Sequence, residues 1–160
     1  MRSFSDLLAF HTVLDELFAE HQYALLHFKF EEALEILKRY EADLFAHMLD
    51  EEEILMPVYE ERAEIERGGG VKLFLDEHEK MRQHILLFKQ TTAELMSDPN
   101  PEPTLIKLLD RESFYKRLCS HHDLRESGIL YPALDGVTDE AERAEMAARL
   151  RRGPEMATAA

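Results

Sequence analysis

The spacing of apolar residues is the feature that most constrains the fold of this chain. Leucine, phenylalanine and methionine recur every three or four positions over long stretches, as one face of an α-helix requires. No glycine or proline occurs before Pro57, and no stretch sustains the alternation of apolar and polar residues that marks a strand. The sequence therefore predicts an all-α protein.

Breaks in this pattern divide the chain into five expected helices. The clearest is the glycine run at residues 68–70; a proline-rich loop spans 98–103, and a weaker turn signal lies at 28–30. The expected helices cover residues 5–28, 31–57 with a continuation to 66 after a kink, 71–96, 104–130 and 138–150, with Thr104 and Thr138 as N-caps of the last two. Four long amphipathic helices with short links predict an antiparallel up-down-up-down four-helix bundle with a short C-terminal helix. We expect one domain over residues 1–150 and a frayed tail over 151–160.

One short motif occurs twice, on the second and fourth expected helices. The copies run from His47 to Pro57 and, 75 positions later, from His122 to Pro132. In each copy a Glu stands four residues after the His, and an Ile-Leu pair precedes the closing Pro. Residues four apart on a helix point the same way, so each copy presents an imidazole and a carboxylate together. Two such pairs suit a two-metal site between helices, with one nitrogen and one bridging carboxylate from each copy.

Two further histidines are expected at the same level along the bundle. His47 and His122 lie 16 and 18 residues past the starting points Glu31 and Thr104 of their helices, and His78 lies 18 before the end of the third helix. Similar distances from one end of a bundle place side chains at similar heights. On the first helix His11 lies 17 residues before Phe28, whereas His21 lies only 7 before it. The predicted metal ligands are His11, His47, Glu51, His78, His122 and Glu126.

His21 is the alternative ligand on the first helix. Ten residues at about 1.5 Å each separate it from His11 by roughly 15 Å along the axis, so only one of the two can reach the site. A turn near residue 34 would favour His21, although the unbroken helical pattern from Glu31 to Leu37 argues against a turn there.

Other titratable residues near the motifs are interpreted as peripheral. We expect His27, His84 and His121 on other helix faces. Glu52 is interpreted as surface charge. Glu77 is interpreted as a solvated acid, with a hydrogen bond to a ligand imidazole as the alternative.

Composition limits the partners that the chain can have. The 33 acidic and 19 basic residues give a formal net charge of −14, which argues against nucleic acid, because phosphates need a concentrated positive surface. The single cysteine, Cys119, excludes an internal disulfide and suits a reducing compartment. The apolar stretch at the N-terminus is too short for a secretion signal or a membrane span. We therefore expect a cytoplasmic protein that binds neither nucleic acid nor a membrane.

The predicted ligand set indicates a class of metal. Four imidazoles and two carboxylates suit iron, manganese or zinc better than calcium or magnesium, which prefer oxygen ligands. Two carboxylates able to bridge, with imidazoles on either side, suit a pair of ions.

On these residues the chain resembles the hemerythrin-like (HHE cation-binding) domains. Their pattern is a His on the first helix, His-x-x-x-Glu on the second and fourth, and a His on the third, and the likeness covers residues 10–132. The resemblance implies a non-haem centre of two iron ions, with the four histidines as terminal ligands and Glu51 and Glu126 as bridges. It also implies a small ligand such as dioxygen or nitric oxide.

Two departures from the oxygen-carrying hemerythrins qualify the expected activity. Those proteins have a second His where this chain has Arg82, and an Asp five residues after the fourth-helix His where this chain has Glu126 four after it. The ligand set is more similar to that of bacterial domains that repair damaged iron centres or that sense iron and oxygen. The main hypothesis is therefore a protein that binds or senses dioxygen, nitric oxide or iron, rather than an enzyme. A di-iron redox enzyme or iron-centre repair protein is one alternative, and a metal-free acidic helical interaction module is another.

Overall fold

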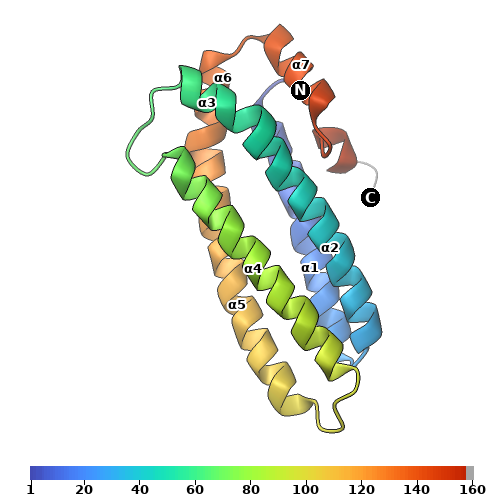
Figure 1. The fold of residues 1–160 in the computed structure, drawn as a ribbon. Helices are drawn as coiled ribbons and strands as arrows, with labels where there is room; N and C mark the ends of the chain where they lie inside the picture. Colours follow the sequence, from blue (N-terminus) through green and yellow to red (C-terminus); the bar gives the residue numbers. More distant parts are fainter. Residues whose placement is uncertain (158–160) are drawn as a thin grey trace.

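Four long helices lie side by side along the length of the molecule (Figure 1). The computed structural model describes residues 1–157, which contain no strand. The long helices are α1 (Leu8–Leu26), α2 (Phe30–Asp50), α4 (Val71–Leu95) and α5 (Glu102–Arg125). α1 packs on α2, α2 on α4 and α4 on α5, while α1 and α5 close the ring with the loosest packing. The prediction of an all-α protein is confirmed.

The link between α1 and α2 is a tight turn at residues 27–29. Phe28 has a φ of 56°, and the amide groups of Phe28 and Lys29 donate to the carbonyls of Leu25 and Ala24 at 3.0 Å each. Glycine is the usual residue at such a left-handed helix end, because a side chain strains this conformation. The turn predicted from weak signals at 28–30 is confirmed.

Both copies of the sequence motif end in a widened, π-helical turn. The π-helical segments are η2 (Glu51–Leu55), which continues α2, and η3 (Glu126–Leu130), which continues α5. The carbonyls of Glu51 and Glu126 accept hydrogen bonds from amides five residues later, those of Met56 and Tyr131. A proline follows next in each copy and cannot donate the usual bond, which is consistent with the widening of the turn before it.

Within residues 1–157 the chain continues as a helix beyond each of these turns; a continuation after a kink was expected for the second helix but not for the fourth. The short helices α3 (Met56–Arg62) and α6 (Tyr131–Val137) follow the π-helical segments and lie at the upper end of the bundle (Figure 1). The predicted caps are also displaced: α5 begins after Pro101 instead of Thr104, and the N-cap of α7 (Glu140–Arg149) is Asp139 instead of Thr138. Asp139 accepts a hydrogen bond from the Glu142 amide at 2.8 Å, as an N-cap residue does.

Residues after α7 contact the bundle. Arg151 and Arg152 both bind Asp50 on α2, the first through its guanidinium at 3.0 Å and the second through its amide at 2.8 Å. Residues Pro154–Ala157 form a short 3-10 helix, η4, just as Phe4–Leu7 form η1 at the other terminus. Of the expected frayed tail at 151–160, residues 151–157 make these contacts and form η4, and 158–160 lie outside the described residues.

The apolar interior consists of two clusters with a polar layer between them. The larger cluster fills the lower bundle and includes Phe18, Leu37 and Phe88; the smaller fills the upper end and includes Phe4, Leu55 and Leu134.

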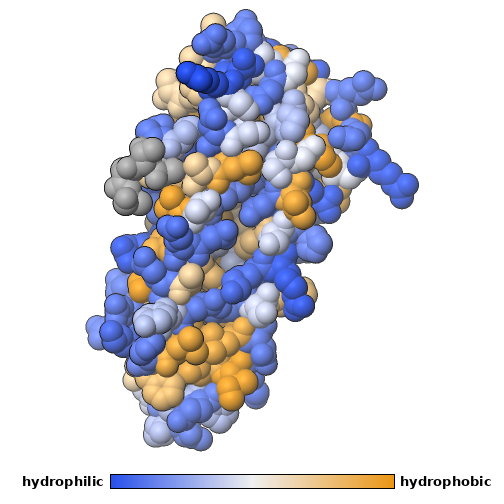
Figure 2. Space-filling view, turned by 180° about the vertical axis from the view of Figure 1, so that it is seen from behind, coloured by the Kyte–Doolittle hydropathy of each residue, from blue (hydrophilic) through white to orange (hydrophobic). Residues whose placement is uncertain are grey.

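Hydrophilic residues cover much of the molecular surface seen in Figure 2, and apolar atoms gather near its lower end. Among the described residues, no helix combines the length and apolar character needed to cross a bilayer.

Candidate metal centre

The structure brings all six predicted ligands together in the polar layer. Each of the six has at most 8% of its surface exposed, and both glutamates are fully buried. Each long helix contributes one histidine, and the two glutamates are the first residues of the two π-helical segments. The residues of this six-residue cluster are His11, His47, Glu51, His78, His122 and Glu126.

The four histidines form two pairs that meet through their Nε2 atoms. The Nε2 atoms of His11 and His47 are 2.9 Å apart, and those of His78 and His122 are 3.1 Å apart. Two nitrogens bound at right angles to one ion, each at about 2.1 Å, lie about 3.0 Å from each other. Both spacings therefore match neighbouring ligands of a transition-metal ion.

The two glutamates connect the histidine pairs. Glu51 places Oε1 3.4 Å from His47 Nε2 and Oε2 3.3 Å from His78 Nε2. Glu126 places Oε2 3.3 Å from His11 Nε2 and Oε1 2.6 Å from His122 Nε2. The six residues therefore form two groups of four potential ligands, one around each histidine pair. Both carboxylates belong to each group, and the ligand atoms of a group lie within 4.8 Å of one another. This is the arrangement that two bridging carboxylates require.

Three of the imidazoles face further carboxylates with their outer nitrogen. His78 Nδ1 donates to Glu52 at 2.8 Å, while the Nδ1 atoms of His122 and His11 lie 3.3 Å from Glu77 and Asp123. Such partners fix the orientation and protonation of a ligand histidine. The interpretation of Glu52 as surface charge is wrong, and Glu77 takes the alternative role. These contacts join different helices, so spacing along one helix does not reveal them.

The donor set fits a pair of cations. Because Nδ1 of His78 donates to Glu52, Nε2 of the neutral His78 ring keeps a lone pair that faces the cluster. In addition, Glu51 Oε2, 3.3 Å from this nitrogen, is buried without a hydrogen-bond donor. Buried acceptors that face one another are unfavourable unless a positive charge lies among them.

The two buried carboxylates of the cluster, Glu51 and Glu126, also repel each other. Burial and the charge of Glu51 raise the pKa of Glu126, whereas the imidazoles of His47 and His78 outweigh burial and hold the pKa of Glu51 well below its usual range. Burial lowers the pKa of His47 to about 4. For His11, burial is outweighed by Asp123 and Glu126, and the pKa rises to about 9. Cations bound by the carboxylates would relieve their mutual repulsion.

Tyr131 is a site residue that the sequence did not assign. Its buried hydroxyl donates to Glu51 Oε1 at 2.7 Å and lies 3.4 Å from His11 Nε2. Tyr131 directly follows the second π-helical segment, five residues after Glu126. Its contact with Glu51 joins residues 80 positions apart, so only the position of Tyr131 beside Pro132 could have drawn attention to it.

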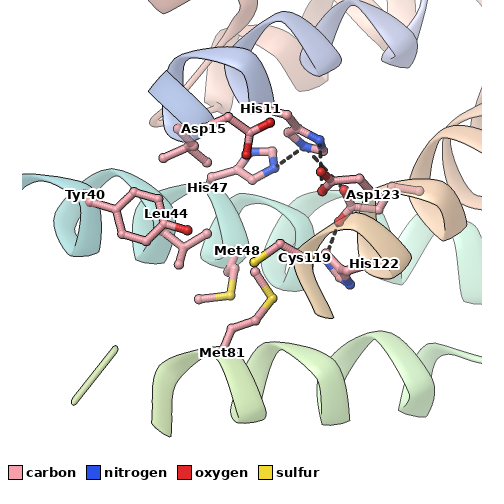
Figure 3. Close-up of a pocket in the computed structure, with 12 residues that line it drawn as sticks. His11, Asp15, Tyr40, Leu44, His47, Met48, Met81, Cys119, His122 and Asp123 are labelled. Carbon is pink, nitrogen blue, oxygen red and sulfur yellow. Dashed lines mark hydrogen bonds and ion pairs between the residues drawn. The ribbon is translucent and has the colours of Figure 1, made fainter. Parts of the chain in front are cut away.

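A small cavity adjoins the cluster on the side of the lower core. Its volume is about 20 Å³, and it is lined by residues of all four long helices, including His11, His47 and His122, and by Glu126 of η3. Figure 3 shows Asp15, Tyr40, Met48 and Cys119 around it. A volume of this size holds about one water-sized molecule. The cavity therefore suits a ligand of one or two heavy atoms.

The remaining histidines lie away from the cluster. His21 is fully buried in the lower core, where Nδ1 donates to the Ala33 carbonyl at 2.8 Å and Nε2 lies 2.6 Å from Glu112 Oε1. His27 and His121 are exposed, and His84 is half-buried beside Phe88. None of the four belongs to either group of potential ligands found among the described residues.

Comparison with protein families agrees with this geometry. A model of the family described as "Hemerythrin HHE cation binding domain" matches residues 2–134, most of the chain. Comparisons with curated proteins and with solved structures gave no match. The resemblance noted from the repeated motif is thus confirmed, and the buried clusters of histidine and glutamate are compatible with metal binding. The chain belongs to the hemerythrin HHE cation-binding domain family.

Proposed function

We propose that the six-residue cluster binds two iron ions and that the protein uses them to bind or sense dioxygen or nitric oxide, or to sense iron itself. The observation that carries this proposal is the sharing of Glu51 and Glu126 between two histidine pairs with Nε2 spacings of 2.9 and 3.1 Å. The succession of α1, α2, α4 and α5 supports an up-down-up-down bundle as the frame. Iron fits the family and the mixed nitrogen and oxygen ligands, although manganese or zinc would accept the same donors.

When bound, an iron pair supplies open coordination positions and one-electron redox chemistry. The chain itself orients the metal ligands and limits the size of the exogenous ligand. Glu52, Glu77 and Asp123 orient three of the imidazoles, and the Tyr131 hydroxyl orients Glu51. The cavity limits the exogenous ligand to a diatomic or a similarly small molecule.

Iron content and thermal stability test the proposal together. Protein purified anaerobically should contain about two iron ions per chain, and His47→Ala and His122→Ala should lose them. Iron at 1,000 times its dissociation constant should stabilise the fold by about 4 kcal/mol, which raises Tm by roughly 8–16 °C in a chain of this size. His121→Ala is the matched control, since His121 adjoins His122 but is exposed.

The alternatives predict different results. A metal-free interaction module would show no iron and no change of Tm in either ligand variant, and that outcome would overturn the proposal. Addition of nitric oxide to the anaerobic iron-loaded protein should change its visible absorption spectrum. Absence of that change would refute the binding of diatomic ligands while leaving iron binding intact.

A redox enzyme is the second candidate. Tyr40 and Cys119, both oxidisable, line the cavity, and the hydroxyls of Tyr40 and Tyr115 are 2.7 Å apart. Steady consumption of hydrogen peroxide with an added reductant would support this activity, and its absence would favour binding or sensing.

A further inference from the structure

Three of the four flanks of the six-residue cluster carry arginines. Between α2 and α4, Arg82 donates to Glu52 at 2.7 Å. Between α4 and α5, Arg125 donates to Glu77 at 2.6 Å. Beside α2 on its other side, Arg152 donates to Asp43 at 2.9 Å, and η4 of the same terminal segment packs on α1. Each of these acids is therefore already paired with a guanidinium.

The flank between α1 and α5 carries two aspartates beside the cluster. Asp15 stands one helical turn after His11, and Asp123 directly follows His122. Both aspartates line the cavity beside the cluster, and Figure 3 shows them near His11 and His47. Asp15 is exposed and, within residues 1–157, makes no hydrogen bond or ion pair with another side chain. Lys116 lies on the same flank, where it donates to Gln22 at 3.1 Å.

Open grooves lead along this flank to the cavity. One groove of about 330 Å³ shares Asp15, Tyr40 and Cys119 with the cavity. A second, of about 360 Å³, shares His11 and Asp123 with it. The two grooves meet at Ser120, along the most loosely packed pair of long helices. Surface and cavity are thus separated here by few side chains.

A buried carboxylate lies at the inner end of this route. Glu126 is fully buried and lines the cavity, and its Oε1 and Oε2 lie 2.6 and 3.3 Å from Nε2 of His122 and His11, two members of the six-residue cluster. A route that begins at an unpaired exposed carboxylate and ends at a buried carboxylate favours the movement of a cation inward. On the other three flanks, a guanidinium group already neutralises the acid.

We propose that the seam between α1 and α5 is the path by which divalent cations reach the cluster. Asp15 captures the ion at the outer end of this path, beside Asp123. This inference rests on the proposed function, because it concerns how the same cluster is loaded. Asp15 acts on the rate of loading and is not a ligand of the loaded site, since it belongs to neither group of potential ligands. Exposed charges act over about 8 Å at physiological salt, so the effect must weaken as salt is added.

The rate of iron(II) uptake tests the path. Metal-free protein is mixed anaerobically with iron(II), and the unbound metal is trapped with a coloured chelator after set times. At low salt, Asp15→Asn should load roughly 3 to 10 times more slowly, and Asp15→Lys more slowly still, as expected when electrostatic steering is lost. At 0.5 M salt the difference should shrink to less than twofold, and the final iron content should equal that of the unchanged protein.

Glu20→Gln provides the matched control. It removes one exposed negative charge from α1 but lies in a groove that does not adjoin the cluster. Equal loading rates for Asp15→Asn and the unchanged protein would overturn the path, as would an equal slowing in Glu20→Gln. A failure of the unchanged protein to take up iron would overturn the proposed function along with the path, so the two failures are distinguishable.

Discussion

Replacement of Glu112 by leucine tests the assignment of His21 as a structural residue of the lower core. The two side chains are fully buried, and His21 Nε2 lies 2.6 Å from Glu112 Oε1. Glu112 Oε2 also accepts a hydrogen bond from Gln22 at 3.0 Å. The substitution therefore removes the carboxylate from a buried pair and leaves the imidazole with only the Ala33 carbonyl as partner.

The expected loss follows from this burial. Removal of one member of a buried polar pair of this kind costs about 3–5 kcal/mol, because the Nε2 atom that remains has neither water nor a partner. In a chain of this size each kcal/mol shifts Tm by roughly 2–4 °C, so Glu112→Leu should lower Tm by roughly 6–20 °C. The double variant His21→Leu and Glu112→Leu should recover part of that loss, because no unpaired polar group remains.

Urea unfolding of the metal-free proteins measures the free energy of unfolding directly. Glu20→Leu, at the exposed position before His21, should change it by less than about 0.5 kcal/mol. Iron content must stay unchanged in all three variants if His21 is not a ligand. A loss below about 1 kcal/mol in Glu112→Leu, or a loss of iron like that of His47→Ala, would refute the reasoning.

Three further predictions follow from single residues. Phe28→Gly should raise the free energy of unfolding by about 1 kcal/mol, since Phe28 has a φ of 56° and is half-exposed; lower stability in urea would contradict this. Burial raises the pKa of the Cys119 thiol from 9.0 to about 12, so its thiolate fraction at pH 8, and with it the alkylation rate by iodoacetamide, should be roughly 1,000-fold below that of the unfolded chain. Fast alkylation of the folded protein would show that Cys119 is not held as the protonated thiol. Tyr131→Phe removes the donor to Glu51 and should weaken iron binding by roughly 10- to 100-fold in a chelator competition assay; an unchanged affinity would mean that Tyr131 does not orient the carboxylate.

The spacing of apolar residues was sufficient to predict an all-α fold, because a helix requires its own period and tolerates few breakers. The boundaries were less predictable. The signals at Thr104 and Thr138 are ordinary N-cap signals, yet the helices begin elsewhere, where Pro101 and Asp139 serve instead. Alternatives a few residues apart differ by little energy locally, so packing against the rest of the bundle selects among them.

The residues of the candidate site were likewise predictable from the sequence only in part. Counting residues from the links placed His11, His47, His78 and His122 at one height, and the structure has them there. That argument depends on one turn, and the turn at residues 27–29 lies close enough to its expected place for His11 to join the cluster, leaving His21 in the lower core.

By itself, the sequence determined the periodic helices and the repeated His-x-x-x-Glu motif, because both depend on contacts within one or two helical turns. The tertiary structure alone decided the partners of each imidazole and the approach of Tyr131 to Glu51. It also decided that Arg82 and Arg125 cover two flanks of the cluster, while Asp15 lies beside the cavity. These features join residues far apart in the chain, and their geometry is fixed only when four helices pack around one buried polar layer.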